Sequence, residues 1–97
     1  MVKLEIQYFR GCPNTGELLD NLGEVVNTYG ERVEMTEVLV EDPETAKRVG
    51  FRGSPTLLID GEDFERRPVP ESPNLSCRLY PEGLPTVDEI ITRIEQA

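Results

Sequence analysis

The stretch from Tyr8 to Thr15 constrains the fold of this chain most, because it joins a predicted strand to a predicted helix and places a cysteine between them. Residues Val2 to Tyr8 alternate apolar and polar side chains, which is typical of a strand with one buried face. Pro13 suits the first position of a helix, where its missing N–H is not needed. Unpaired N–H groups and the positive end of the helix dipole stabilise a thiolate at such a helix start. We therefore expect Cys12 to be reactive.

The rest of the chain predicts alternating strands and helices. Apolar residues at helical spacing predict a helix from Pro13 to Tyr29 that ends at Gly30. Residues 66–85 contain five prolines, so we expect a long loop there, broken by a turn or short strand near Cys77. The other expected elements are a strand over residues 33–40, parallel to the first, a helix from Pro43 to Val49, a strand from Thr56 to Ile59 with a hairpin return through Phe64 and Glu65, and a last helix capped by Thr86 and Glu89.

Length and composition limit the class of protein. The 97 residues suffice for one domain, residues 1–97. A net charge of −9 argues against nucleic acid and anionic membranes as partners, and no apolar run reaches the roughly 20 residues of a membrane span. No signal peptide precedes the first strand, so we expect a cytoplasmic protein. The absence of histidine excludes imidazole catalysis and the usual zinc sites.

Three windows of the sequence contain no acidic residue: Ile6 to Gly16, Thr45 to Ile59 and Ser72 to Pro81. These windows hold both cysteines and the Ser54-Pro55 pair. They also hold five of the ten basic residues, whereas the rest of the chain carries the other five and all nineteen acidic residues. A site at which these windows converge would be locally positive. The bases in the windows are Arg10, Lys47, Arg48, Arg52 and Arg78.

The order of elements and two motifs resemble the thioredoxin fold along nearly the whole chain. In that family a cysteine opens the first helix and a cis-proline after a small residue faces it; here Cys12 to Thr15 and Ser54-Pro55-Thr56 correspond. The resemblance implies an α/β, thioredoxin-like fold with a mixed four-stranded sheet flanked by helices. Thr15 stands where dithiol members have their resolving cysteine, so the motif is monothiol, of the Cys-x-x-Thr type.

The chain is more particularly similar to small bacterial thioredoxin-like proteins with Gly-Cys-Pro-Asn, Gly-Ser-Pro-Thr and Ser-Cys-Arg-x-Tyr motifs, here at residues 11–14, 53–56 and 76–80. Such proteins are often described as related to alkylmercury lyase. That enzyme uses two cysteines and an aspartate, and Cys12 and Cys77 correspond to the cysteines. Thr15 occupies the position of the aspartate, so carbon–mercury cleavage is not expected.

These observations favour a thiol–disulfide oxidoreductase that acts on a small thiol or disulfide, or on a protein disulfide. Cys12 would attack as the thiolate, with Thr15 donating a hydrogen bond to its sulfur, and Cys77 or glutathione, the candidate co-substrate, would resolve the mixed disulfide. Pro55 and the backbone of Ser54 would hold the extended partner. Three arginines would lower the pKa of the thiol and attract an anionic substrate: Arg10, Arg52 and Arg78. No cofactor or metal is expected in this role.

Two alternatives remain open at this stage. Two thiolates without imidazole or carboxylate suit a soft ion such as mercury, so Cys12 and Cys77 would bind metal without redox turnover. In the other alternative the fold serves a protein partner and Cys12 is only a small buried apolar residue. A disulfide requires Cα atoms within about 7 Å, which the sequence does not show. The oligomeric state is likewise open.

Overall fold

A four-stranded mixed sheet forms the centre of the computed structural model, which describes residues 1–96. The strands lie in the order β2-β1-β3-β4. β1 pairs in parallel with β2 and antiparallel with β3, and β4 is antiparallel to β3. The predicted mixed sheet and the parallel pairing of its first two strands are therefore confirmed. The strands are β1 (Val2–Tyr8), β2 (Val33–Leu39), β3 (Thr56–Ile59) and β4 (Glu62–Asp63).

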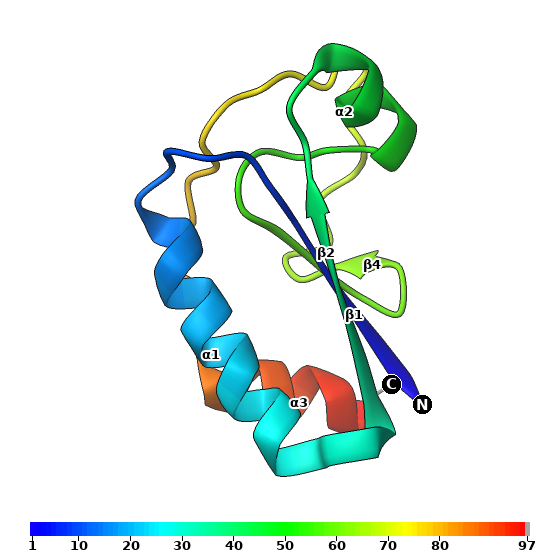
Figure 1. Cartoon of the computed structure of the whole chain (residues 1–97), viewed down its shortest axis with the longest axis vertical. Coiled ribbons are helices and arrows are strands. Elements are labelled where there is room, and N and C mark those ends of the chain that lie inside the picture. The colour runs from blue at the N-terminus through cyan, green and yellow to red at the C-terminus, as the bar shows by residue number, and fades with distance from the viewer. Residues whose placement is uncertain (97) are drawn as a thin grey trace.

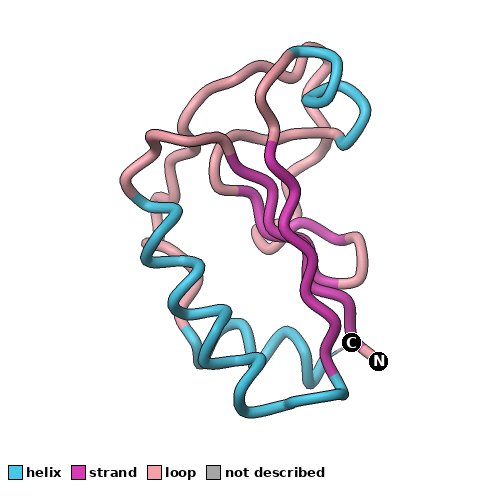
Figure 2. Tube along the Cα trace, viewed as in Figure 1, coloured by secondary structure: helices cyan, strands magenta, loops and turns pink. Residues whose placement is uncertain are grey.

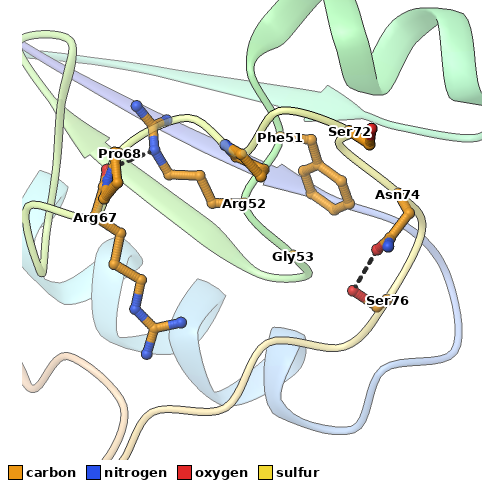
Figure 3. Close-up of a pocket in the computed structure, with 9 residues that line it drawn as sticks. Phe51, Arg52, Gly53, Arg67, Pro68, Ser72, Asn74 and Ser76 are labelled. Atoms are coloured by element: carbon orange, nitrogen blue, oxygen red, sulfur yellow. Dashed lines mark hydrogen bonds between the residues drawn. The ribbon is translucent and has the colours of Figure 1, made fainter.

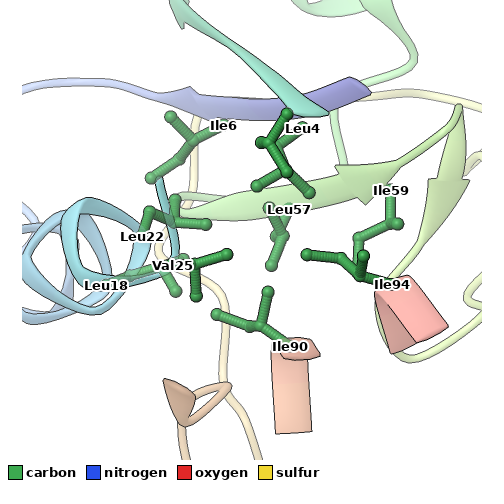
Figure 4. Packing of buried hydrophobic residues seen from close by; sticks show 10 residues of the cluster. Leu4, Ile6, Leu18, Leu22, Val25, Leu57, Ile59, Ile90 and Ile94 are labelled. Carbon is green, nitrogen blue, oxygen red and sulfur yellow. The ribbon is translucent and has the colours of Figure 1, made fainter. Parts of the chain in front are cut away.

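Helices α1 (Asn14–Tyr29) and α3 (Val87–Gln96) lie on the same side of the sheet (Figures 1 and 2). Their apolar stripes meet the inward-facing side chains of β1 and β3 and form the main core (Figure 4). The helical period of 3.6 and the strand period of 2 bring these side chains together, as the sequence predicted. The central members of the core are Leu4, Ile6, Leu18, Leu22, Val25, Leu57, Ile59, Ile90 and Ile94.

Helix α2 (Pro43–Val49) lies beyond the carboxyl end of β2 (Figure 1). Its Ala46 packs with Val40 and Phe51 in a second, smaller cluster. The fully buried Gln7 of β1 donates a side-chain hydrogen bond to the carbonyl of Val49, 3.2 Å away. This bond ties the end of α2 to β1.

Two local details differ from the expectations. Gly30 does not simply end α1 but opens the short 3₁₀ helix η1 (Gly30–Arg32). The hairpin return is shorter than expected, because β4 ends at Asp63. The carboxylate of Asp63 accepts hydrogen bonds from the backbone N–H groups of Glu65 and Arg67, at 2.9 and 3.1 Å, which turns the chain out of the strand.

The long segment between β4 and α3 returns to the sheet at one point. A single parallel bridge joins Cys77 to Ser54. This bridge is the short strand-like interruption that the sequence predicted near Cys77. It brings the loop to the end of the sheet at which α1 begins (Figure 1).

Candidate functional site

Cys12 lies in the turn that leads from β1 into α1. Pro13 has helical dihedral angles at the N-cap position, so the helix begins one residue later than expected, at Asn14. The Cys12 carbonyl accepts the N–H of Thr15 at 3.3 Å, which places the sulfur-bearing residue within the first turn. Cys12 is 7% exposed. The helix start favours a thiolate at this position, whereas the burial of the side chain opposes the charge.

Cys12 forms a disulfide with Cys77, with 6.0 Å between their Cα atoms. Cys77 comes from the long loop and is exposed, whereas Cys12 is buried. The structure therefore answers the question that the sequence left open, whether these two residues lie within reach of each other. The disulfide has one interior and one exposed partner.

Ser54 links the two cysteine-bearing segments. Its N–H donates to the carbonyl of Ser76 at 2.8 Å, and its carbonyl accepts the N–H of Arg78 at 2.9 Å. Its hydroxyl accepts the N–H of Phe9 at 3.1 Å. The peptide bond between Ser54 and Pro55 is cis, as expected from the motif. The three acid-free windows of the sequence thus converge at the disulfide.

The sequence predicts that Pro55 and the backbone of Ser54 hold an extended partner, and in this structure a segment of the chain itself makes those contacts. Both backbone groups of Ser54 are bonded to the chain's own segment Ser76–Arg78. In the oxidised protein this segment occupies the place that was assigned to a substrate. Cys77 therefore stands where the sulfur of such a substrate would stand.

Arg78 was expected to face the sulfur and attract an anionic substrate, but its side chain is buried. Its guanidinium forms a two-pronged ion pair with Asp63, at 2.6 and 2.9 Å, and a further contact with Glu65 at 3.0 Å. The guanidinium also lies over the ring of Tyr80, 4.5 Å from its centroid. These partners satisfy its charge, so Arg78 is not available to a substrate.

Burial and hydrogen bonding around Arg78 shift the pKa values of Asp63 and Tyr80. Desolvation would raise the pKa of Asp63, but the hydrogen bonds from Arg78 and from the N–H groups of Arg67 and Glu65 more than offset it, so that pKa lies below its usual range. Burial raises the pKa of the Tyr80 phenol. Its hydroxyl donates to the carbonyl of Pro55. The network therefore holds a carboxylate beside a neutral phenol.

The other two predicted arginines differ in their surroundings. Arg52 donates to the carbonyls of Arg67 and Gly50, at 2.9 and 3.2 Å, and lies 3.9 Å from Asp63. Arg10 is exposed. Because Arg52 and Arg78 are both paired with acids or carbonyls, the positive charge expected at the site is largely neutralised.

Thr15 lies where the sequence predicted, one turn beyond Cys12. It is 8% exposed, and its hydroxyl has no hydrogen-bond partner within residues 1–96. A buried hydroxyl without a partner is costly. In the oxidised protein the hydroxyl is therefore unused.

A pocket of about 270 Å³ opens beside the Cys77 segment (Figure 3). Arg52 and Arg67 lie on one side of it, and Asn74 and Ser76 lie on the other. The side chain of Ser76 donates a hydrogen bond to Asn74 across 2.8 Å. The pocket therefore offers polar groups to a small molecule, and one of them belongs to Ser76, the residue before Cys77 in the sequence.

The sequence did not reveal Asp63 and Glu65 as parts of the site, and it singled out Tyr80 only as a motif residue without a role. Asp63 and Glu65 lie outside the acid-free windows, in a hairpin that reads only as a turn and a return strand. Arg78 is 15 residues away from Asp63, so no local spacing joins them. The Ser-Cys-Arg-x-Tyr motif contains Arg78 and Tyr80 but does not indicate which residues they contact.

No protein-family model and no curated protein sequence matches this chain. Several solved structures match this chain; one of them, described as that of a malarial protein, matches over 99% of this chain and 96% of its own, with a TM-score of 0.67 and 13% sequence identity. At this identity the likeness shows the fold alone. None of the helices formed by residues 1–96 is both long and apolar enough to cross a membrane.

Proposed function

We propose that the chain is a thioredoxin-like thiol–disulfide oxidoreductase whose redox pair is Cys12 and Cys77. The observation that carries the proposal is the disulfide between a cysteine at a helix start and an exposed cysteine beside a cis-proline. The element order and the mixed sheet support the thioredoxin-like assignment. In the cytoplasm, the proposed compartment, such a disulfide would be a catalytic state and not a permanent staple.

The difference in exposure assigns the two sulfurs different roles. An incoming thiolate attacks the exposed Cys77, the Cys12–Cys77 bond breaks, and Cys12 leaves as a thiolate that the helix start and the Thr15 hydroxyl stabilise. A second thiolate then attacks the mixed disulfide on the substrate sulfur and releases Cys77. Two thiols are oxidised to one disulfide, and the protein gains two electrons and two protons. This order makes Cys77 the exchanging sulfur, the reverse of the roles expected from the sequence.

The same steps in reverse reduce a substrate disulfide. Cys77 forms the mixed disulfide, and the Cys12 thiolate resolves it. Glutathione or another small thiol is the proposed co-substrate, and the pocket lined by Ser76, the residue before Cys77, supplies polar groups for it. No further cofactor takes part in this scheme.

The test compares turnover of the wild type with that of C12S and C77S, using glutathione disulfide or an aromatic disulfide reagent. We expect the wild type to turn over and both variants to stop after one exchange. C12S should accumulate a mixed disulfide on Cys77, whereas C77S should react more slowly through the buried Cys12. Wild-type turnover no faster than that of the double variant C12S/C77S would overturn the function. If C77S forms the mixed disulfide faster than C12S, Cys12 is the attacking sulfur, as the sequence predicted.

Soft-metal binding is the second candidate function. The 6.0 Å separation of the two Cα atoms would bring two thiolates close enough to hold one mercury ion after reduction. Titration of the reduced protein with mercuric chloride, in competition with dithiothreitol, separates this candidate from the first. A metal binder would retain one ion per chain under excess dithiol and show no disulfide turnover.

A further inference from the structure

Arg78 directly follows the exposed Cys77 in the sequence and forms a buried ion pair with Asp63. We propose that Arg78 is a positioning residue, whose ion pair with Asp63 keeps Cys77 beside Cys12 while the disulfide is open. This inference rests on the proposed function, because it concerns the same redox pair. Arg78 touches neither sulfur in this scheme but fixes the segment that carries one of them.

Asp63 provides the fixed end of the pair. It belongs to β4 and lies opposite Leu58 in the sheet. Its carboxylate accepts two backbone hydrogen bonds from the turn that follows, in addition to the two bonds from Arg78. The side chains of Asp63 and Arg78 are 1% and 0% exposed, so neither is screened by water. The anchor is therefore part of the sheet itself.

Contacts with residues 53–55 also hold the segment around Cys77. Gly53 lies so close that a Cβ atom there would come within 2.8 Å of the Arg78 Cβ. The backbone of Ser54 bonds the residues on both sides of Cys77, and the Tyr80 hydroxyl bonds the Pro55 carbonyl. Neither sulfur takes part in any of these contacts. We therefore expect them to persist when the disulfide is reduced.

A thiol held in place has a high effective concentration toward its partner, because little freedom is left to lose when the bond forms. The equilibrium between dithiol and disulfide in the folded protein thus depends on the ion pair. Weakening the pair should release Cys77 in the reduced protein and favour the dithiol.

The experiment measures the disulfide equilibrium of the purified protein against oxidised and reduced dithiothreitol, for the wild type, D63N and E62Q. Glu62 is the matched control, because it is the neighbouring residue and also contacts two arginines, Arg66 and Arg93, but not Arg78. We expect the equilibrium constant for disulfide formation to fall about tenfold in D63N and to stay within about twofold in E62Q. The backbone N–H of Arg78 should resist hydrogen exchange in the reduced wild type and exchange rapidly in reduced D63N.

A second variant guards against failure of D63N to fold. E65Q removes the more exposed of the two acids on Arg78 and leaves Asp63 in place, so a fall of about threefold is expected. A purely structural role would lower the stability of both redox forms equally and leave the equilibrium constant unchanged in D63N and E65Q. That result would overturn the inference. The measurement of the disulfide equilibrium needs no substrate. Absence of turnover in the wild type would therefore reject the proposed function and leave the inference about Arg78 intact.

Discussion

Thr15 places a buried hydroxyl without a partner one turn from a cysteine. An unsatisfied buried polar group costs about 1–3 kcal/mol, and the oxidised protein bears this cost. In the proposed mechanism the Cys12 thiolate of the reduced protein would be an acceptor for the same hydroxyl. Thr15 would then stabilise the reduced state relative to the oxidised state, which is the behaviour expected of a group that lowers the pKa of a thiol.

The substitution T15V should therefore affect the two redox states in opposite ways. The oxidised protein should gain about 1 kcal/mol in free energy of unfolding, since the unpaired hydroxyl is gone. The pKa of the Cys12 thiol should rise in the reduced protein, which slows its alkylation by iodoacetamide at pH 6. The conservative T15S keeps the hydroxyl and serves as the control. Equal alkylation rates of Cys12 in T15V and the wild type, mapped by mass spectrometry, would contradict the role.

The titration of Asp63 makes the free energy of unfolding depend on pH. Its pKa is lower in the folded than in the unfolded protein, so its contribution is complete above the unfolded value of about 3.9 and is lost as the pH falls through the folded value. D63N should lower the free energy of unfolding at pH 7 by about 3 kcal/mol, because it leaves a buried guanidinium partly unpaired. Urea unfolding of the oxidised protein at pH 7 and pH 3 should show a smaller acid-induced loss in D63N than in the wild type. Parallel losses would assign the acid sensitivity to other carboxylates.

At the scale of elements, the ends of the helices follow local rules. Thr86 and Glu89 exchange hydrogen bonds at the start of α3, each 3.1 Å long, and form the predicted capping box. Asp42 caps α2 in a similar way by accepting the N–H of Thr45 at 2.7 Å. Each cap satisfies backbone groups that would otherwise have no partner within the helix.

Removal of the cap in T86A should lower the free energy of unfolding by about 1 kcal/mol. Thr92 lies on the exposed side of the same helix and its hydroxyl bonds only the Asp88 carbonyl, so T92A is a matched control with a change within about 0.5 kcal/mol. Chemical denaturation of both variants measures the difference. A loss in T92A as large as that in T86A would show that the cap is not the cause.

Most elements were predictable because their signals are local. The alternation in β1, the apolar stripe of α1 and the Asp42-Pro43 start of α2 depend on neighbours within a few residues, and their bounds agree with the structure to within one residue. The site was only partly predictable. Cys12 was found from its place at the helix start, but the pairing of Arg78 with Asp63 depends on a loop returning to a hairpin, and no spacing along the chain encodes that.

At the scale of the whole molecule, the disulfide joins the first helix to the last loop across 65 residues. Closing a loop of this length restricts the unfolded chain and should contribute about 4 kcal/mol to stability in the loop-entropy treatment. The reduced wild type and C77S should therefore both unfold at lower urea concentration than the oxidised protein, by similar amounts. Equilibrium unfolding with and without reductant measures this. A difference below about 1 kcal/mol would mean that the cross-link hardly restricts the unfolded chain.

The bonds of Ser54 to the chain's own segment bear on selectivity. Proteins that recognise a peptide by adding it as a strand read several of its side chains through a row of free amide and carbonyl groups. Here that row is already filled by Ser76–Arg78. A disulfide would then be chosen by how freely its sulfur reaches an exposed side chain, and not by the residues around it. For the proposed oxidoreductase we therefore expect tolerance toward many low-molecular-mass disulfides, and poor activity on folded proteins that bury their disulfides.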